Sequence, residues 1–322
     1  MKRMGTRLTL CTATVWASIA MSGSPDLVLA ATASTHAEQT LPSQKKWSEL
    51  NQAMGSQPVD ARIDSVWHLI PGLAGWQLNA KASEQATKKA TDGKIHLVWQ
   101  QVKPAVALNT LAAEPIFRGP SSEKSISLMV NVSWGEQYVP AMLKILRQAR
   151  VHVTFFLDGQ WVKAHPDLVR QMARDGHAIG SHGTGHPDFR KLSTAQLQGQ
   201  ISDTNQTIES VTGKPVRVIA PPAGAYDNRL VRLAKADDMY TILWTADTVD
   251  WRRPPADVIV QRAKHGLTPG CLLLMHPTAP TVRALPQILK MIEASGYQTK
   301  TIADVIAERP AVKPPSVLST AD

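Results

Sequence analysis

A short strand-like segment followed at once by a polar turn occurs at residues 176–186, which read Gly-His-Ala-Ile-Gly-Ser-His-Gly-Thr-Gly-His. Residues 177–181 have the composition of a short strand, and the two glycines that follow favour a tight loop. The loop carries His182 and His186, four residues apart. Functional side chains of β/α folds lie at this position, just after the carboxyl end of a strand.

The same alternation of strand and helix extends from residue 124 to residue 308. Strands are predicted at 126–132, 151–157, 177–181, 216–220, 240–244, 272–275 and 297–300. Helices are predicted at 139–146, 161–174, 193–213, 228–237, 256–265 and 282–295, and from 302 onward. Six or seven β/α units in about 185 residues predict an α/β fold with a parallel sheet, namely a distorted (β/α)7 barrel.

The first thirty residues predict a secretory signal peptide. Lys2, Arg3 and Arg7 form a basic start, a mainly apolar run follows, and residues 28–30 suit a cleavage site. The alternative is an uncleaved amino-terminal anchor, which would be the protein's sole contact with a membrane. No later segment has the length and hydrophobicity of a bilayer span.

The other flanking regions are assigned by composition and pattern. The expected divisions are a linker at 31–45, a small N-terminal α/β unit at 46–110, a connector at 111–123 and a disordered tail at 309–322. Asp64 is expected to cap a short helix in the small unit. That unit is either an independent module or a cover for the barrel.

Charge and cysteine content narrow the function classes. The formal net charge of +9 falls to +7 without residues 1–30, which suits attraction to anionic wall polymers or merely solubility. The sequence has no basic cluster with interleaved aromatic residues, so we do not expect nucleic-acid binding. We expect the protein to be a monomer. Cys11 lies in the predicted signal, so Cys271 is left alone, and we expect it to be a buried, inert thiol.

Polar motifs follow five of the predicted strands, so their side chains should meet at one rim. They are Asn131-Val132-Ser133-Trp134-Gly135, His182 to His186, Pro221-Pro222-Ala223-Gly224, Asp247 with Asp250-Trp251, and His276.

Each motif suggests a role. His182 and His186 are spaced to hold one metal ion, although structural histidines are the alternative. Asp250 is predicted to accept a hydrogen bond from a catalytic imidazole, or else to cap a helix. His276 is placed to donate a proton to a leaving amine, or else to bond the backbone. Trp134 is expected to stack on a sugar ring or to pack at the rim, and so is Trp251.

These motifs together resemble the polysaccharide deacetylase family, also called the NodB-homology family or carbohydrate esterase family 4. The resemblance rests on Thr154-Phe155-Phe156, Gly159, residues 176–182, His186-Pro187, residues 221–224, Asp250-Trp251 and residues 272–276, in the family's order. Trp134-Gly135 and Trp67-His68-Leu69-Ile70-Pro71-Gly72 further resemble a sporulation-associated bacterial branch.

The resemblance implies a reaction and a location. A divalent metal, zinc or alternatively cobalt or manganese, would activate water to release acetate from an N-acetylated cell-wall glycan such as peptidoglycan. His182 and His186 match the family's histidine ligands, and His276 matches its acid. Pro222 and Gly224 fall in the third motif and are predicted, with the rim tryptophans, to contact substrate. The protein would be secreted or associated with the cell wall.

The sequence also departs from the family pattern. Asn131 aligns with the catalytic base, no carboxylate occupies the remaining ligand position, and Ala220 and Ala223 replace an arginine and an aromatic residue. Glu136 is the nearest carboxylate, but it should begin the next helix. We nevertheless predict a metal-dependent deacetylase, and the alternative is a catalytically impaired, glycan-binding pseudoenzyme of the same fold. A different amidase or esterase reaction is the third possibility.

Overall fold

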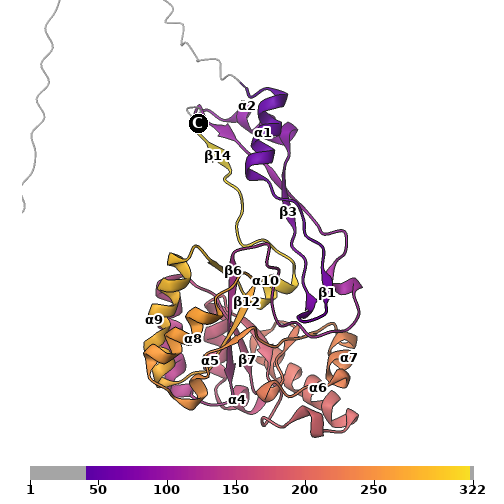
Figure 1. The fold of residues 1–322 in the computed structure, drawn as a ribbon, viewed down its shortest axis with the longest axis vertical. Helices are drawn as coiled ribbons and strands as arrows, with labels where there is room; N and C mark the ends of the chain where they lie inside the picture. The colour runs from indigo at the N-terminus through magenta and orange to yellow at the C-terminus, as the bar shows by residue number, and fades with distance from the viewer. Residues whose placement is uncertain (1–40, 320–322) are drawn as a thin grey trace, which may run out of the picture. The chain divides into compact units, whose positions relative to one another are not determined.

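The computed structural model describes residues 41–319, and the predicted signal peptide and most of the linker lie outside them (Figure 1). The barrel strands follow the order β10-β9-β8-β7-β6-β12-β11, and every neighbouring pair is parallel. A further strand, β13, also pairs with β6. These strands are β6 (Ser125–Val132), β7 (Thr154–Leu157), β8 (Ala178–Ser181), β9 (Val218–Ile219), β10 (Tyr240–Thr241), β11 (Ala246–Asp247), β12 (Cys271–Met275) and β13 (Gln298–Thr299).

One continuous segment joins the two edges of this sheet. Its first part, β10, pairs with β9, and its last part, β11, pairs with β12. Between them, the amide of Thr245 donates to the carbonyl of Leu272 (3.0 Å). The sheet therefore curls into the predicted distorted barrel, and the carboxyl ends of its strands share one rim.

The strands β6, β7 and β12 are buried on both faces, which explains their continuous apolar runs. In β6, Leu128 and Val130 pack against the surrounding helices, whereas Met129 points into the barrel interior. Because side chains alternate along a strand, Asn131 falls on the interior face near the rim. The barrel helices are α3 (Val139–Ala149), α4 (Gly159–Ala164), α5 (Pro166–Arg174), α6 (Thr194–Thr212), α7 (Asn228–Ala236), α8 (Ala256–Gly266), α9 (Ala279–Ala294) and α10 (Ile302–Ile306).

One helix prediction was wrong in the barrel. A single helix was expected at 161–174, but the structure has α4 and α5 with a break at His165. Pro166 causes the break, because proline cannot continue the hydrogen-bond ladder and disfavours helical geometry in the residue before it. The helix predicted at 193–213 is confirmed as α6, which begins with a capping box formed by Ser193 and Gln196.

The chain before the barrel forms small sheets and two helices. Its elements are α1 (Gln44–Met54), β1 (Arg62–Asp64), β2 (His68–Ile70), β3 (Gly75–Leu78), α2 (Ala80–Lys89), β4 (Ile95–His96) and β5 (Trp99–Val102). The helix expected after Asp64 is absent there. The Asp64 carboxylate instead accepts hydrogen bonds from the amides of Val66 and Trp67 (both 2.9 Å), and so closes the β1–β2 hairpin.

This early part of the chain contributes to the barrel interior. Leu69 from β2, Leu108 and Ile116 are buried in the same cluster as Met129 and Phe156 from the barrel strands. The carboxylate of Glu308, at the end of the barrel region, accepts from the amides of Gly72 and Leu108 (both 3.0 Å). The β1–β2 region therefore packs on the barrel, whereas α1, β3 and β5 share a separate hydrophobic cluster that includes Trp47, Leu78 and Trp99.

The tail differs from the expected disordered segment over its described residues. Val317–Leu318 form β14, which pairs antiparallel with β4. The indole of Trp99 donates to the carbonyl of Pro315 (2.8 Å), and the indole of Trp76 donates to that of Val312 (2.9 Å). Composition did not show these partners, because they lie more than two hundred residues earlier in the chain. The helices described between residues 41 and 319 include none with the length and hydropathy of a transmembrane span.

Candidate active site

A cavity of about 390 Å³ opens at the rim. Its lining comprises Asn131, Ser133, Trp134, His182, His186, Ala223, Trp244, Asp247, Trp251, Leu274 and His276. Asp250 lies behind His276, and Pro222 and Gly224 line an adjoining hollow together with His186 and Ala223. The structure thus brings the predicted site residues to one region, while their roles stay predictions.

His182 is held as a neutral imidazole. Its Nδ1 lies 2.8 Å from the carbonyl oxygen of Ala220, so Nδ1 carries the proton and Nε2 keeps its lone pair. Burial, aided by the nearby His186 and His276, lowers the pKa of His182 to about 3. Its ring centroid is 5.4 Å from that of His186.

The loop between these histidines is anchored by a residue that the sequence reasoning missed. Asp158 is buried and accepts hydrogen bonds from the amide of Gly185 (2.7 Å) and from two amides at the start of α4. His186 itself adopts a left-handed backbone with φ +54°, which is strained for a residue other than glycine. The sequence offered one signal for Asp158: this aspartate directly precedes Gly159, where α4 begins, and aspartate commonly caps a helix.

Asp250 and His276 form a closely bonded pair. The His276 Nδ1 donates to Asp250 Oδ1 (2.8 Å), and the His276 amide donates to Oδ2 (2.7 Å). Thr281 Oγ1 also donates to Oδ2 (2.7 Å), and the carboxylate is wholly buried. This arrangement fixes the ring's tautomer, so that Nε2 is the nitrogen available for proton transfer.

Trp134 covers this pair. Its ring lies nearly parallel to the His276 ring, with an interplanar angle of 4° and centroids 6.0 Å apart. Gly135 makes the turn possible, because it has φ +86° and a Cβ there would lie 2.2 Å from the Pro277 carbonyl oxygen. The residues Trp134 and Trp251 are 37% and 46% exposed, so each offers aromatic surface at the rim.

The end of β6 supplies no carboxylate to the cavity. Within residues 41–319, Asn131 Oδ1 and Ser133 Oγ are buried and have no hydrogen-bond partner. Glu136 is exposed, does not line the cavity, and begins a short 3-10 turn, in agreement with the sequence expectation. Asp247 does line the cavity, and burial raises the pKa of its carboxyl.

The donors present do not fit a catalytic zinc centre. Such centres use three protein ligands and leave one position open. In the described part of the chain, no three His, Cys, Asp or Glu side chains come together to hold a metal ion. His182 and His186 therefore lack the carboxylate that the family pattern would add.

Comparison with known proteins identifies the family. A family model described as polysaccharide deacetylase matches residues 118–242. The chain is 37% identical over 260 residues to the uncharacterised protein YlxY of Bacillus subtilis, covering 80% of this chain and 81% of YlxY. It is 28% identical over 205 residues to the B. subtilis peptidoglycan-N-acetylmuramic acid deacetylase PdaA, covering 61% and 76%.

A solved structure agrees with this assignment over a longer stretch. The wild-type BA3943 protein of Bacillus anthracis, described as a pseudoenzyme of carbohydrate esterase family 4, matches with a TM-score of 0.74 and 35% identity. The match covers 83% of this chain and 95% of that structure. A BA3943 mutant described as having restored enzymatic activity has the same TM-score and 33% identity. Taken with its fold and rim motifs, these matches show that the chain belongs to the polysaccharide deacetylase family, carbohydrate esterase family 4.

Proposed function

We propose that this protein binds an N-acetylated cell-wall glycan, such as peptidoglycan, in its rim cavity and does not hydrolyse it efficiently. The observation that carries the proposal is the pair of buried, unpartnered oxygens of Asn131 and Ser133 at the end of β6. An amide and a hydroxyl cannot accept a proton from water at neutral pH, so neither serves as a general base. Both can accept a hydrogen bond from a ligand.

The chemistry of the cavity suits a sugar. Exposed faces of Trp134 and Trp251 offer apolar surface to the C–H face of a pyranose ring. Asn131 and Ser133 lie deeper, where the N–H of an acetamido group can satisfy an unpartnered oxygen. Binding pockets commonly combine aromatic walls with a few convergent polar groups.

The relatives support both parts of this proposal. PdaA is named for acting on peptidoglycan, and BA3943 is described as a pseudoenzyme. A wall polymer lies outside the cytoplasmic membrane, so this function needs export, which the predicted signal at residues 1–30 would provide. The metal dependence expected from His182 and His186 and the link to sporulation stay predictions.

Slow deacetylation is the second candidate. It is favoured by Asp247, a carboxylate in the cavity whose pKa is raised by burial, and by the pairing of Asp250 with His276. A carboxylate whose pKa is raised toward the working pH accepts a proton from water more readily, and a positioned imidazole can protonate a leaving amine.

Acetate release separates the two candidates. Wild-type protein is incubated with N-acetylglucosamine oligomers or peptidoglycan, with added zinc or cobalt, and binding is measured in parallel by calorimetry. The proposal expects binding without acetate above the protein-free level. Acetate release that is lost in Asp247→Asn but kept in an Asp203→Asn control, whose side chain is exposed on α6 and does not line the cavity, would instead establish the second candidate.

Restoring a carboxylate tests the base assignment. Asn131→Asp and Ser133→Asp are each expected to produce acetate release with zinc where the wild type gives none, because each supplies an ionisable oxygen at the end of β6. If neither variant gains activity while both still bind the glycan, the missing carboxylate is not what limits catalysis.

A further inference from the structure

A second cavity, of about 400 Å³, opens at the end of the barrel opposite the rim. His152, His177 and Arg217 line it, and they precede the neighbouring strands β7, β8 and β9 respectively. The amino ends of parallel strands lie away from the rim, and this cavity shares no lining residue with the rim cavity. We call it the floor pocket. Its volume is within the range of small-molecule sites.

His177 gives the floor pocket a buried donor without a partner. The amide of Val153 donates to His177 Nδ1 (3.2 Å), so Nε2 is the nitrogen that carries the proton. His177 is 6% exposed, and its Nε2 has no hydrogen-bond partner within residues 41–319. Burial lowers the pKa of His177 to about 4, so the ring is neutral at pH 7 and keeps this tautomer. A buried N–H without an acceptor costs free energy, which a ligand oxygen would recover.

The floor pocket also carries an excess of positive charge. Lys214, Arg217 and Arg309 line it, and Asp304 is the single carboxylate in its described lining. Asp304 lies 3.4 Å from Arg309, which leaves the two other cations uncompensated within the pocket. Arg217 contacts Asp238 outside the pocket at 3.9 Å, in an exposed pair that water screens. Lys214 has no ion pair among the described residues.

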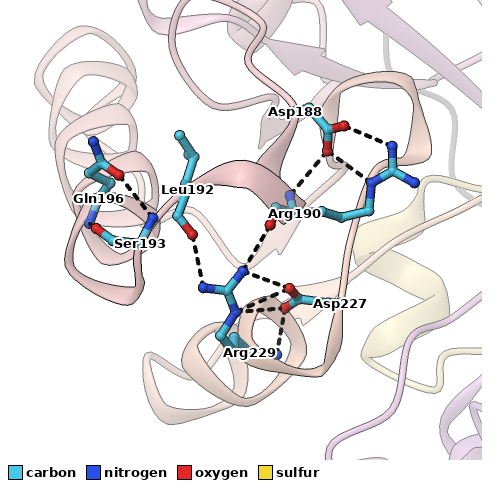
Figure 2. A network of polar contacts seen from close by, with 7 residues as sticks. All are labelled: Asp188, Arg190, Leu192, Ser193, Gln196, Asp227 and Arg229. Carbon is cyan, nitrogen blue, oxygen red and sulfur yellow. Dashed lines mark hydrogen bonds and ion pairs between the residues drawn. The ribbon is translucent and has the colours of Figure 1, made fainter.

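Arginines on the rim side of the barrel are matched by carboxylates instead. Figure 2 shows Arg190 bonded to Asp188 and Arg229 bonded to Asp227, and the Nη2–oxygen distance is 2.7 Å in both pairs. Each of these guanidinium groups is held and neutralised by its partner. The floor pocket lacks this compensation, and a surplus of positive charge favours an anionic ligand.

The directions from which the donors come favour a tetrahedral anion. His177 lies before β8, Lys214 and Arg217 lie before β9, and Arg309 follows α10. Three separate segments therefore surround the pocket. A carboxylate offers two oxygens in one plane, whereas a phosphate group presents oxygens in several directions and is a preferred partner of arginine and lysine.

We propose that the floor pocket binds a phosphate group and is a second ligand site, independent of the rim cavity. One phosphate oxygen accepts from His177 Nε2 once the exposed ring of His152, which packs against it with centroids 5.9 Å apart, turns aside. The other oxygens face Lys214 and Arg217. The phosphate belongs either to a small molecule or to a phosphodiester polymer, and these two sources share the chemistry that the pocket recognises.

Calorimetry at low ionic strength with inorganic phosphate and with poly(glycerol phosphate) tests this site. Wild-type protein should bind at least one probe with a Kd of about 1 mM or below. Lys214→Met and Arg217→Met should each weaken binding about tenfold, because each removes a charged partner of the phosphate. The matched control is Arg190→Met, which removes the same charge from a compensated pair on the rim side and should keep the affinity. In a parallel NMR titration, the His177 Nε2 signal should shift as the site fills.

Each outcome decides for or against the floor pocket. Binding of inorganic phosphate shows that the phosphate group alone is sufficient, and binding of the polymer alone identifies a phosphodiester ligand. If neither probe binds to wild-type protein, the proposal is overturned. Unchanged affinity in both Lys214→Met and Arg217→Met, an equal loss in Arg190→Met, or an unshifted His177 signal at saturation also overturns it. None of these failures affects the proposed function, because the two cavities have no residue in common.

Discussion

Replacing Thr281 by valine tests whether the buried Asp250 carboxylate depends on its hydrogen bonds. Asp250 is 0% exposed and accepts from His276 Nδ1, the His276 amide and Thr281 Oγ1 at 2.7–2.8 Å. Valine is close to threonine in volume, so the change leaves little cavity but removes one of the three donors to Asp250, together with the hydrogen bond between Thr281 Oγ1 and Thr278 Oγ1 (2.6 Å). A hydrogen bond to a charged group contributes roughly 1.5–3 kcal/mol.

The expected effect is a loss of about 2 kcal/mol in the free energy of unfolding. For a chain of 322 residues, with an unfolding entropy of about 2.1 cal/mol/K per residue, that corresponds to a fall in Tm of about 3 °C. Thermal and urea unfolding followed by circular dichroism measure both quantities. Thr207→Val is the matched control, because the Thr207 hydroxyl donates to the Asp203 carbonyl on an outer turn of α6. The control should stay within about 0.5 kcal/mol of wild type. A similarly small change in Thr281→Val would refute the reasoning.

Three further predictions concern individual side chains. Ser133→Asp should raise the zinc affinity about tenfold or more in calorimetry, since it adds a carboxylate to the cavity that holds both histidines; an unchanged affinity would contradict the donor argument. Because folding lowers the pKa of His182 from 6.5 to about 3, its contribution to stability is complete above about pH 6.5 and is lost as the pH falls toward 3. The free energy of unfolding measured with urea should be lower at pH 5 than at pH 7, and the His182→Gln variant should show a smaller difference between the two pH values. An equal difference in the variant and the wild type would contradict this role of His182. Burial raises the pKa of Cys271 to about 11, so a Cys11→Ser protein should react with Ellman's reagent only after unfolding, and fast native reaction would contradict burial.

The barrel was predictable because its signal repeats. Buried parallel strands read as short apolar runs, and each is followed by a helix with an apolar face. The strand predicted at 126–132 corresponds to β6, and Cys271 is buried at the start of β12 as expected. The rim residues could be grouped because strand ends of one parallel sheet share an edge.

Long-range contacts and local exceptions escaped the sequence reasoning. Pro166 divides a helix whose apolar pattern continues across the break, and the tail contacts β4, Trp76 and Trp99, far earlier in the chain. In the site, Trp244 and Asp247 line the cavity, yet neither was assigned a role from sequence. Trp244 and Asp247 reach the cavity because the segment that joins the two sheet edges curls inward. No local sequence pattern marks that curl.

The central claim is that the rim cavity binds an N-acetylated glycan but lacks the carboxylate needed to hydrolyse it. A single NMR titration of wild-type protein with the N-acetylglucosamine hexamer, with zinc present, follows the indole N–H signals and free acetate in the same sample. The account predicts saturable shifts of the Trp134 and Trp251 indole signals and no acetate above a protein-free control. Unshifted indole signals, or acetate that accumulates in proportion to protein, would contradict it.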